Sequence, residues 1–259
     1  MVHCINISKK RLFVFDLDQT LAESKTPMDA EMDALLSRLL AVCPVAVIGG
    51  GWFPQFETQL LEPLSCSPDL LKRLHVFPTS GSCYMRYGNE WEEVYRHEIA
   101  LEDRARIKAV FERAFQEIGY EHPKETFGEL IQDRGTQVTF SALGQQAPVE
   151  KKYAWKGSAL DRRHEIATAM RPHLSDFEIK IPGTTSIDVT MKGIDKGYGV
   201  LQMSERLGVP IEAMVFTGDA LYPGGNDEPV KRTGIETVVV SGPEETKALL
   251  QGWLEILER

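Results

Sequence analysis

Cysteine and long apolar runs are scarce in this chain. Its 259 residues include four cysteines, whose spacing fits no metal-binding pair. A chain of this size needs no disulfides to hold a core, so reduced thiols are expected. No apolar run approaches the roughly 20 residues that cross a bilayer. We therefore expect a cytoplasmic protein that does not bind a membrane.

Positive charge is also in short supply. The chain has 29 lysines and arginines against 38 aspartates and glutamates, which gives a formal net charge of -9. Non-specific nucleic-acid binding depends on clustered basic residues, so nucleic acid is not an expected partner. Lys9, Lys10 and Arg11 precede an apolar stretch as in a signal peptide, but Asp16 ends that stretch after four residues. The stretch is instead predicted to be a strand.

The order of the apolar segments predicts an α/β protein. Strand-like runs at 12–15, 45–48 and 74–77 alternate with amphipathic segments around 28–42 and 53–64. Strands that alternate with helices in this way form a parallel sheet. The sequence has no internal repeat and no low-complexity segment.

The pattern changes between residue 87 and about residue 189. A charged helix is predicted at 101–118, an edge-type alternating strand at 137–143, a helix at 160–170, and strands at 177–181 and 186–190. This order indicates an α/β unit with an antiparallel sheet. A strand at 237–240 and a helix at 243–257 then return to the first pattern. The predicted division is a core at 1–86 and 190–259 with an inserted domain at 87–189.

Two carboxylates stand at the end of the first predicted strand. Asp16 and Asp18 follow the run 12–15, and ligands of an open parallel sheet bind beyond the carboxyl ends of its strands. Alternate residues point the same way, so both carboxylates can converge on one ion or phosphate. An acidic turn in which Asp18 caps the next helix gives the same pattern, and a second acidic group is what favours a site.

That second group follows the apolar run 213–216. Asp219, Asn226 and Asp227 lie in a segment with glycines at 218, 224 and 225, and these glycines permit a turn that aims the three side chains back at the strand end. Carboxylate and amide oxygens suit Mg²⁺. The sequence therefore predicts a magnesium site built from both strand ends.

These groups resemble the motifs of the haloacid dehalogenase superfamily. Lys196, in Gly-Ile-Asp-Lys-Gly at 193–197, stands where the superfamily has its phosphate-binding lysine, although a Lys-Gly at a helix start is also typical of a solvated amine. The run Pro-Gly-Gly-Asn-Asp at 223–227 resembles the capped phosphomannomutase branch, subfamily IIB. The resemblance implies a Rossmann-like, doubly wound parallel-sheet core with an inserted α/β cap of the C2 type.

The resemblance also implies a mechanism through an aspartyl phosphate. Asp16 would be the nucleophile, and Asp18 would protonate the leaving oxygen and then activate the acceptor. Lys196 would neutralise charge on the transferring group. Mg²⁺ would be held by Asp16, Asp219 and the backbone carbonyl of Asp18, with Asn226 and Asp227 completing the metal motif.

Two positions near the phosphate depart from the family pattern. The family places a hydroxyl where this chain has Gly51, and it places a glycine where this chain has Gln19. Backbone N–H groups of Gly50 and Gly51 can still bind an anion, especially if a helix begins near Phe53. We expect a working but weakened phosphate pocket, with an entrance that Gln19 narrows.

The predicted cap keeps part of the family's sugar-phosphate site. Ser186 and Asp188 match a Ser-x-Asp that contacts sugar hydroxyls and phosphate in the family, and Arg134 matches a cap arginine for the distal phosphate. A solvated turn arginine would look the same. Two other family arginines are missing, one of them at Gln145.

The missing arginines favour one of two enzyme hypotheses, and Gly51 and Gln19 motivate a third hypothesis. A mutase must grip the phosphate far from the nucleophile, and bidentate arginines do this best. We therefore favour a Mg²⁺-dependent phosphatase for a small phosphorylated metabolite, with a hexose phosphate mutase of the phosphomannomutase type as the alternative. A catalytically weak sugar-phosphate-binding protein is the third hypothesis. The resemblance also allows a homodimer through the cap.

Overall fold

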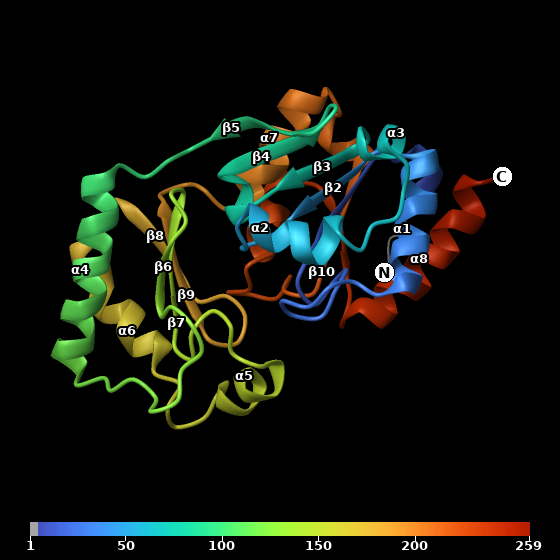
Figure 1. Cartoon of the computed structure of the whole chain (residues 1–259). Helices are drawn as coiled ribbons and strands as arrows, with labels where there is room; N and C mark the ends of the chain where they lie inside the picture. The colour runs from blue at the N-terminus through green and yellow to red at the C-terminus, as the bar shows by residue number, and fades with distance from the viewer. Residues whose placement is uncertain (1–4) are drawn as a thin grey trace. The chain divides into compact units, whose positions relative to one another are not determined.

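The computed structural model describes residues 5–259 and divides them into two compact units (Figure 1). The core unit comprises the described residues up to 96 together with 195–259, and the cap unit comprises 97–194. The predicted boundaries fall earlier, at 86 and 189. The first differs because β4 (Cys83–Tyr87) and β5 (Trp91–Arg96) form an antiparallel pair on the core sheet, where sequence analysis placed the start of the cap.

The core unit is built on a seven-stranded sheet in the order β11-β10-β1-β2-β3-β4-β5. Its other strands are β1 (Leu12–Asp16), β2 (Val45–Ile48), β3 (Leu74–Phe77), β10 (Met214–Gly218) and β11 (Glu236–Val239). These five are parallel to one another, which confirms the predicted α/β class.

Helices cover both faces of this sheet because its strands are apolar on both sides. Phe13 and Phe15 of β1 pack in one cluster with α1 (Ala30–Val42) and α8 (Pro243–Leu257). Leu12 and Val14 face the other way and pack in a second cluster with α7 (Lys196–Leu207). Continuous apolar strands of this kind are typical of doubly covered parallel sheets.

The segment after β2 is less regular than predicted. The expected helix at 53–64 is a short α-helix, α2 (Phe53–Phe56), which continues into a π-helical turn, η2 (Glu57–Leu61). The remaining short helices of the core unit are η1 (Ile7–Lys9), α3 (Pro68–Leu71), η3 (Thr79–Gly81), η5 (Ile211–Ala213) and η6 (Glu228–Thr233).

The cap unit has an antiparallel sheet in the order β6-β7-β9-β8. Its strands are β6 (Ile131–Asp133), β7 (Gln137–Ser141), β8 (Phe177–Lys180) and β9 (Ser186–Met191), and its helices are α4 (Leu101–Ile118), α5 (Val149–Trp155), α6 (Arg163–Met170) and η4 (Arg171–His173). The prediction of β7 as an edge strand is wrong, because the short strand β6 pairs with its outer side.

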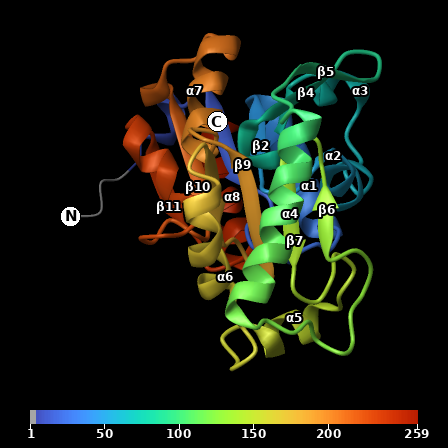
Figure 2. The same cartoon turned by 90° about the vertical axis from the view of Figure 1, so that its left-hand side faces the viewer.

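One face of the cap sheet carries the helices and the other is polar. α4 and α6 lie side by side against the sheet (Figure 2), and Val138 and Phe140 of β7 pack with them. Gln137, Thr139 and Ser141 alternate with these residues and point to the opposite face. The cap therefore pairs an apolar core with a polar sheet surface.

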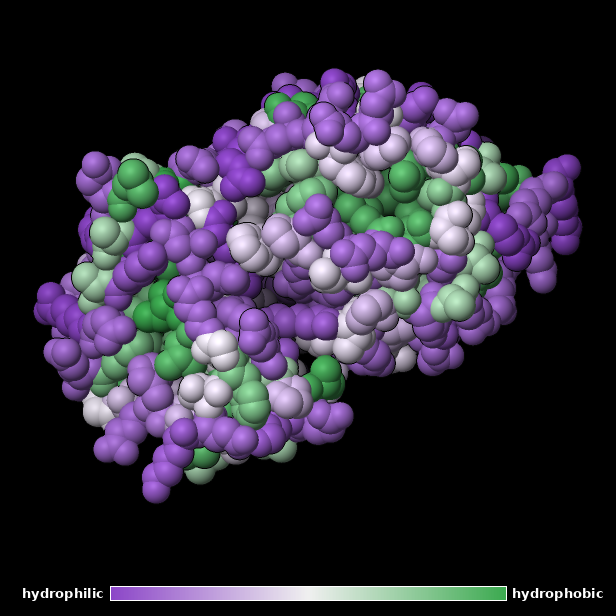
Figure 3. Space-filling view, in the orientation of Figure 1, coloured by the Kyte–Doolittle hydropathy of each residue, from purple (hydrophilic) through white to green (hydrophobic). Residues whose placement is uncertain are grey.

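Hydrophilic residues cover most of the face drawn in Figure 3. Among residues 5–259, no helix is both long enough and apolar enough to cross a membrane. Most of the buried apolar residues are gathered in the clusters described above.

Candidate active site

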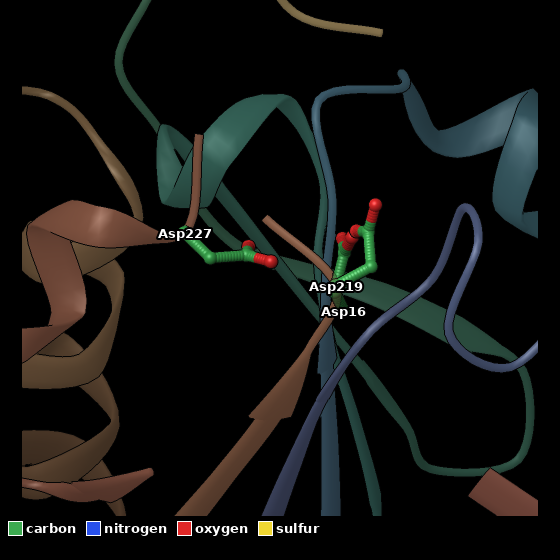
Figure 4. Close-up of side chains that lie close together, drawn as sticks. All are labelled: Asp16, Asp219 and Asp227. Atoms are coloured by element: carbon green, nitrogen blue, oxygen red, sulfur yellow. The ribbon is translucent and has the colours of Figure 1, made fainter. Parts of the chain in front are cut away.

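Three carboxylates meet at the carboxyl end of the core sheet. β1 and β10 are parallel neighbours, with Phe15 opposite Thr217, so Asp16 at the end of β1 and Asp219 just after β10 leave the sheet together. Asp227 lies at the N-cap of η6. One oxygen from each of the three carboxylates lies within 4.8 Å of the others. Figure 4 shows Asp16 and Asp219 side by side, with the Asp227 carboxylate directed at them.

Glycines let the loop after β10 fold back on the strand end. A Cβ on Gly218 would lie 2.9 Å from Cγ of Asp227, and a Cβ on Gly225 would lie 2.8 Å from the carbonyl carbon of Ala220, so neither position has room for a side chain. The backbone N–H of Ala220 donates to Oδ2 of Asp227 at 3.0 Å. The loop thereby fixes Asp227 against β10.

Lys196 lies inside this carboxylate cluster. Its Nζ donates to Oδ1 of Asp16 and to Oδ1 of Asp227, both at 2.5 Å, and the residue is 0% exposed. The amine of Lys196 is therefore buried rather than solvated, which excludes the alternative interpretation of the Lys-Gly pair. The lysine bridges the first and the second acidic groups, as the resemblance implied.

The start of α7 is held in place by its own cap. Asp195 accepts a hydrogen bond from the backbone N–H of Tyr198 at 3.0 Å, as an N-cap residue does. The same carboxylate accepts two hydrogen bonds from Arg232 of η6, at 2.7 and 2.5 Å. This pair ties the helix that carries Lys196 to the segment that carries Asp227. Sequence analysis missed both residues, although an aspartate just before Lys-Gly is an N-cap signal.

Like charges dominate the cluster. Burial raises the pKa of Asp16 well above its usual 3.8, and Asp227 and Asp219 add to this rise while Lys196 opposes it. Burial and the charge of Asp227 raise the pKa of Asp219 to about 6. Burial alone would lower the pKa of Lys196, but Asp16 and Asp227 together raise it.

The donor set fits a hard divalent cation. Three carboxylates share one ammonium group, so the site carries excess negative charge in a buried setting where charge is expensive. Oxygen ligands of this kind suit Mg²⁺. Asn226 lies half-buried beside Asp227, and its role as a metal ligand stays a prediction.

Asp18 has a different environment from Asp16. Its Oδ1 accepts hydrogen bonds from the backbone N–H of Lys25 at 2.8 Å and from Nε2 of Gln59 at 3.2 Å. Its Oδ2 accepts one from Nε2 of Gln55 at 3.1 Å. Among the described residues the carboxylate cluster does not include Asp18. Its side chain is therefore held by amides, and the proposed metal contact through its carbonyl stays a prediction.

The glycine loop lies between β2 and α2. Its carbonyl groups at Gly49 and Gly51 accept from the backbone N–H groups of Ser80 and Thr79 at 2.8 and 2.7 Å, so the loop is fixed to the segment after β3. α2 begins at Phe53, where a helix start was expected. Anion binding by the N–H groups of Gly50 and Gly51 stays a prediction.

The predicted cap residues share the polar face of the cap sheet. Gln132, Thr139, Asp188 and Lys180 form one row across its four strands. Oγ1 of Thr139 donates to Asp188 at 2.8 Å, and Ser186 lies opposite Ser141 two residues along. Sequence analysis missed Lys180, although its alternation with the inward-facing Ile179 places it on this face.

Arg134 follows the edge strand β6 and is held by two amides. Its Nε donates to Oε1 of Gln132 at 2.9 Å, and one terminal nitrogen donates to Oε1 of Gln145 at 3.2 Å. The guanidinium group is thus oriented rather than freely solvated. Gln145 also shows that an amide stands beside Arg134 where the family resemblance predicted another arginine.

A family model described as eukaryotic phosphomannomutase matches residues 32–256. The match begins beyond Asp16 and Asp18, so it does not depend on them. A probable phosphomannomutase of Caenorhabditis elegans is 26% identical over 97% of this chain and 98% of its own length. A phosphomannomutase of Encephalitozoon cuniculi is 27% identical over 92% and 91%.

Solved structures show the same fold at low identity. An IMP-nucleotidase of Plasmodium falciparum has a TM-score of 0.69 and 16% identity, covering 96% of this chain and 71% of its own. The C-terminal domain of a C. albicans trehalose-6-phosphate phosphatase has a TM-score of 0.66 and 14% identity, covering 97% and 96%. These structures confirm the predicted α/β fold.

Proposed function

The chain belongs to the eukaryotic phosphomannomutase family, a family of phosphoryl-transfer enzymes, and on that premise we propose that it is a hexose phosphate mutase. The reaction would move a phosphoryl group between positions 1 and 6 of a sugar such as mannose. The observation that carries this proposal is the length of the similarity, which runs through the cap and both parts of the core. The comparisons favour this alternative over the phosphatase that sequence analysis preferred.

The first half of the reaction would form an aspartyl phosphate on Asp16. A carboxylate oxygen of Asp16 forms a bond to phosphorus while the bond from phosphorus to the sugar oxygen breaks. Asp18 gives a proton to the departing oxygen. Lys196, in contact with Asp16, offsets the charge of the phosphoryl group.

The second half would reverse these roles. Asp18 takes a proton from the acceptor hydroxyl, whose oxygen bonds to phosphorus as the Asp16–phosphorus bond breaks. When the acceptor is a hexose monophosphate, this transfer makes a hexose bisphosphate, which turns round and gives its other phosphoryl group to Asp16, and the isomeric monophosphate is released. Arg134, Ser186 and Asp188 would recognise the distal phosphate and the sugar hydroxyls, because they combine a guanidinium donor with groups that bond to hydroxyls.

Mg²⁺ would be held by Asp16, Asp219 and Asp227. When bound, it would supply positive charge for the phosphoryl oxygens and for the crowded carboxylates. Burial raises the pKa values of Asp16 and Asp219, and the neighbouring carboxylates raise them further; a bound cation would favour the ionised form of both groups.

A phosphatase is the second candidate, and one observation favours it. The amide of Gln145 lies beside Arg134 where a second arginine was expected, so the grip on a distal phosphate is weaker than two guanidinium groups would give. A phosphatase needs only one phosphate to be held, with water as the acceptor. The small phosphorylated substrate is common to both candidates.

A phosphorus NMR time course distinguishes the candidates. Mannose 1-phosphate is incubated with the protein, Mg²⁺ and a trace of hexose bisphosphate, and Asp16→Asn serves as the inactive control. We expect hexose 6-phosphate to appear. Inorganic phosphate alone would establish the phosphatase, and equal spectra for the wild type and Asp16→Asn over a panel of sugar phosphates would contradict an enzyme and leave the sugar-phosphate-binding hypothesis.

A further inference from the structure

A side chain at position 51 would displace the carboxamide of Gln55. A Cβ built on Gly51 lies 2.5 Å from Cδ of Gln55 and 2.9 Å from its Nε2, with Oε1 closer still. Real Cβ atoms do not approach other atoms this closely. The carboxamide of Gln55 therefore fills the volume that a serine or threonine side chain would use.

The carboxamide makes hydrogen bonds that it would lose if it moved. Nε2 of Gln55 donates to Oδ2 of Asp18 at 3.1 Å and to Oε1 of Gln59 at 2.6 Å. Nε2 of Gln59 donates in turn to Oδ1 of Asp18 at 3.2 Å and to the carbonyl of Thr26 at 3.1 Å. Two amides thus hold both oxygens of Asp18, and each amide also supports the other.

The backbone places the two glutamines for this contact. They are four residues apart and so project from one side of the helical segment. Gln59 lies in the π-helical turn η2, closed by the bond from the N–H of Glu62 to the carbonyl of Glu57 at 2.8 Å. π-helical turns are rare and occur frequently at functional sites. Gln59 is 1% exposed, so its amide belongs to the fixed structure around Asp18.

We propose that Gln55 is a positioning residue for Asp18 and takes the place of the side chain that Gly51 lacks. The inference rests on the proposed function, which assigns proton transfer to Asp18. Nε2 of Gln55 holds one oxygen of the Asp18 carboxylate and Nε2 of Gln59 holds the other, so the direction of this carboxylate is fixed from both sides.

Gly51 and Gln55 then form an interdependent pair. Serine at position 51 pushes the carboxamide away from Asp18, so Gly51→Ser damages the wild type. When Gln55→Ala has already vacated the space, serine fits and the same substitution costs little. Residues in direct contact show such non-additive effects, and a double-mutant cycle measures them.

The experiment uses Gly51→Ser, Gln55→Ala, the double variant and the isosteric Gln55→Glu, which keeps the shape and loses the donor. Thr58→Ala, at an exposed position of the same segment, is the matched control. With a hexose phosphate and saturating Mg²⁺, we expect Gln55→Ala and Gln55→Glu to lower kcat about 10- to 100-fold, with KM within about twofold. We expect Gly51→Ser to lower kcat about tenfold in the wild type and less than twofold beside Gln55→Ala.

A substrate whose leaving group needs no proton from Asp18 distinguishes a positioning role of Gln55 from a general structural role. Departure of 4-nitrophenolate needs no proton, so we expect its single-turnover release from 4-nitrophenyl phosphate to fall less than about twofold in Gln55→Ala. Equal slowing of both substrates would overturn the inference. A raised KM with unchanged kcat would also overturn it, because Gln55 would then bind the phosphate itself.

Thermal unfolding of the same proteins tests the pairing without turnover. Gly51→Ser is expected to lower Tm in the wild type and to leave it unchanged beside Gln55→Ala. If the wild type is active and Gln55→Ala has the same kcat, the inference about Gln55 is contradicted and the proposed function is not. If the wild type shows no turnover, the proposed function is contradicted. In that case additive Tm shifts of Gly51→Ser and Gln55→Ala would also contradict the pairing of the two residues.

Discussion

The predicted site residues have different surroundings in the core unit and in the cap unit. In the core, Asp16, Asp219 and Asp227 crowd together around one lysine, and burial and mutual repulsion raise the pKa of the first two. On the cap sheet, the predicted residues also make hydrogen bonds to neutral groups: Asp188 accepts from Thr139, and Arg134 donates to two amides.

The core and cap units also differ in their backbone conformations. The described non-glycine residues with a positive φ all lie in core loops, at Gln19, Lys25, Thr79 and Ser80, whereas every described cap residue with a positive φ is a glycine. Strained conformations of this kind concentrate at functional sites. The described core therefore carries backbone strain and charge repulsion, whereas the cap residues named above are held by hydrogen bonds.

The largest expected effect comes from removing the ammonium group that lies inside the carboxylate cluster. Lys196→Met leaves Asp16 and Asp227 buried without their cation, and breaking a buried pair in this way costs about 3–5 kcal/mol. Urea unfolding measures the loss. Lys72→Met, which removes an exposed pair with Asp69, should cost far less, because solvent screens exposed ion pairs. Equal losses of unfolding free energy in the two variants would mean that Lys196 contributes no more to stability than an exposed lysine does.

Asp219→Asn should act in the opposite direction. The pKa of Asp219 is raised from 3.8 to about 6, so at pH 7 its ionised form destabilises the fold, and this penalty fades as the pH falls through 6 toward 4. Removing the charge should stabilise the metal-free protein by about 2 kcal/mol at pH 7 and should abolish stabilisation by Mg²⁺.

The measurement for Asp219→Asn is the difference in unfolding free energy from the wild type, with and without Mg²⁺, between pH 7 and 4. The difference is needed because His75 titrates in the same window: burial lowers its pKa from 6.5 to about 4, so it destabilises both proteins as the pH falls. A difference that stays constant with pH would contradict the assigned repulsion.

In the cap, a conservative change should affect recognition and leave stability alone. Arg134→Lys keeps the charge but loses the planar donor set held by Gln132 and Gln145, so KM for a hexose bisphosphate should rise about tenfold, with Tm unchanged. Arg113→Lys, on the exposed side of α4, is the control. A fall in Tm for Arg134→Lys would mean that Arg134 also stabilises the fold of the cap.

The sequence predicts the core better than the contacts between its loops. Apolar runs located β1, β2 and β3, and helical periodicity located α4 and α8, because burial on a fixed face leaves a local pattern. The pair β4 and β5 was missed because β5 is half-exposed at the sheet edge and lacks an apolar run.

Some residues of the candidate site were predictable from the sequence, and others were not. Asp16, Asp219 and Asp227 were predictable because the carboxyl ends of parallel strands must meet, and Lys196 came from the family resemblance. Gln55 and Gln59 were not predictable, since their contact with Asp18 depends on a π-helical turn that ordinary helical periodicity does not reveal. Arg232 reaches Asp195 across 37 positions of the chain, and no local pattern encodes such a pair.

The smallest expected effect concerns backbone strain in the core. Gln19 has a φ of 60°, a conformation that costs a non-glycine residue about 1 kcal/mol. Its side chain bonds only to the exposed Glu23 in the described contacts, at 2.7 Å, which contributes little. Gln19→Gly should therefore stabilise the fold by up to about 1 kcal/mol, measured by urea unfolding against Gln19→Ala, which keeps the strain. Should Gln19→Ala be equally stabilising, the side chain rather than the backbone would be the unfavourable element, and the contrast with the glycine turns of the cap would not hold at this position.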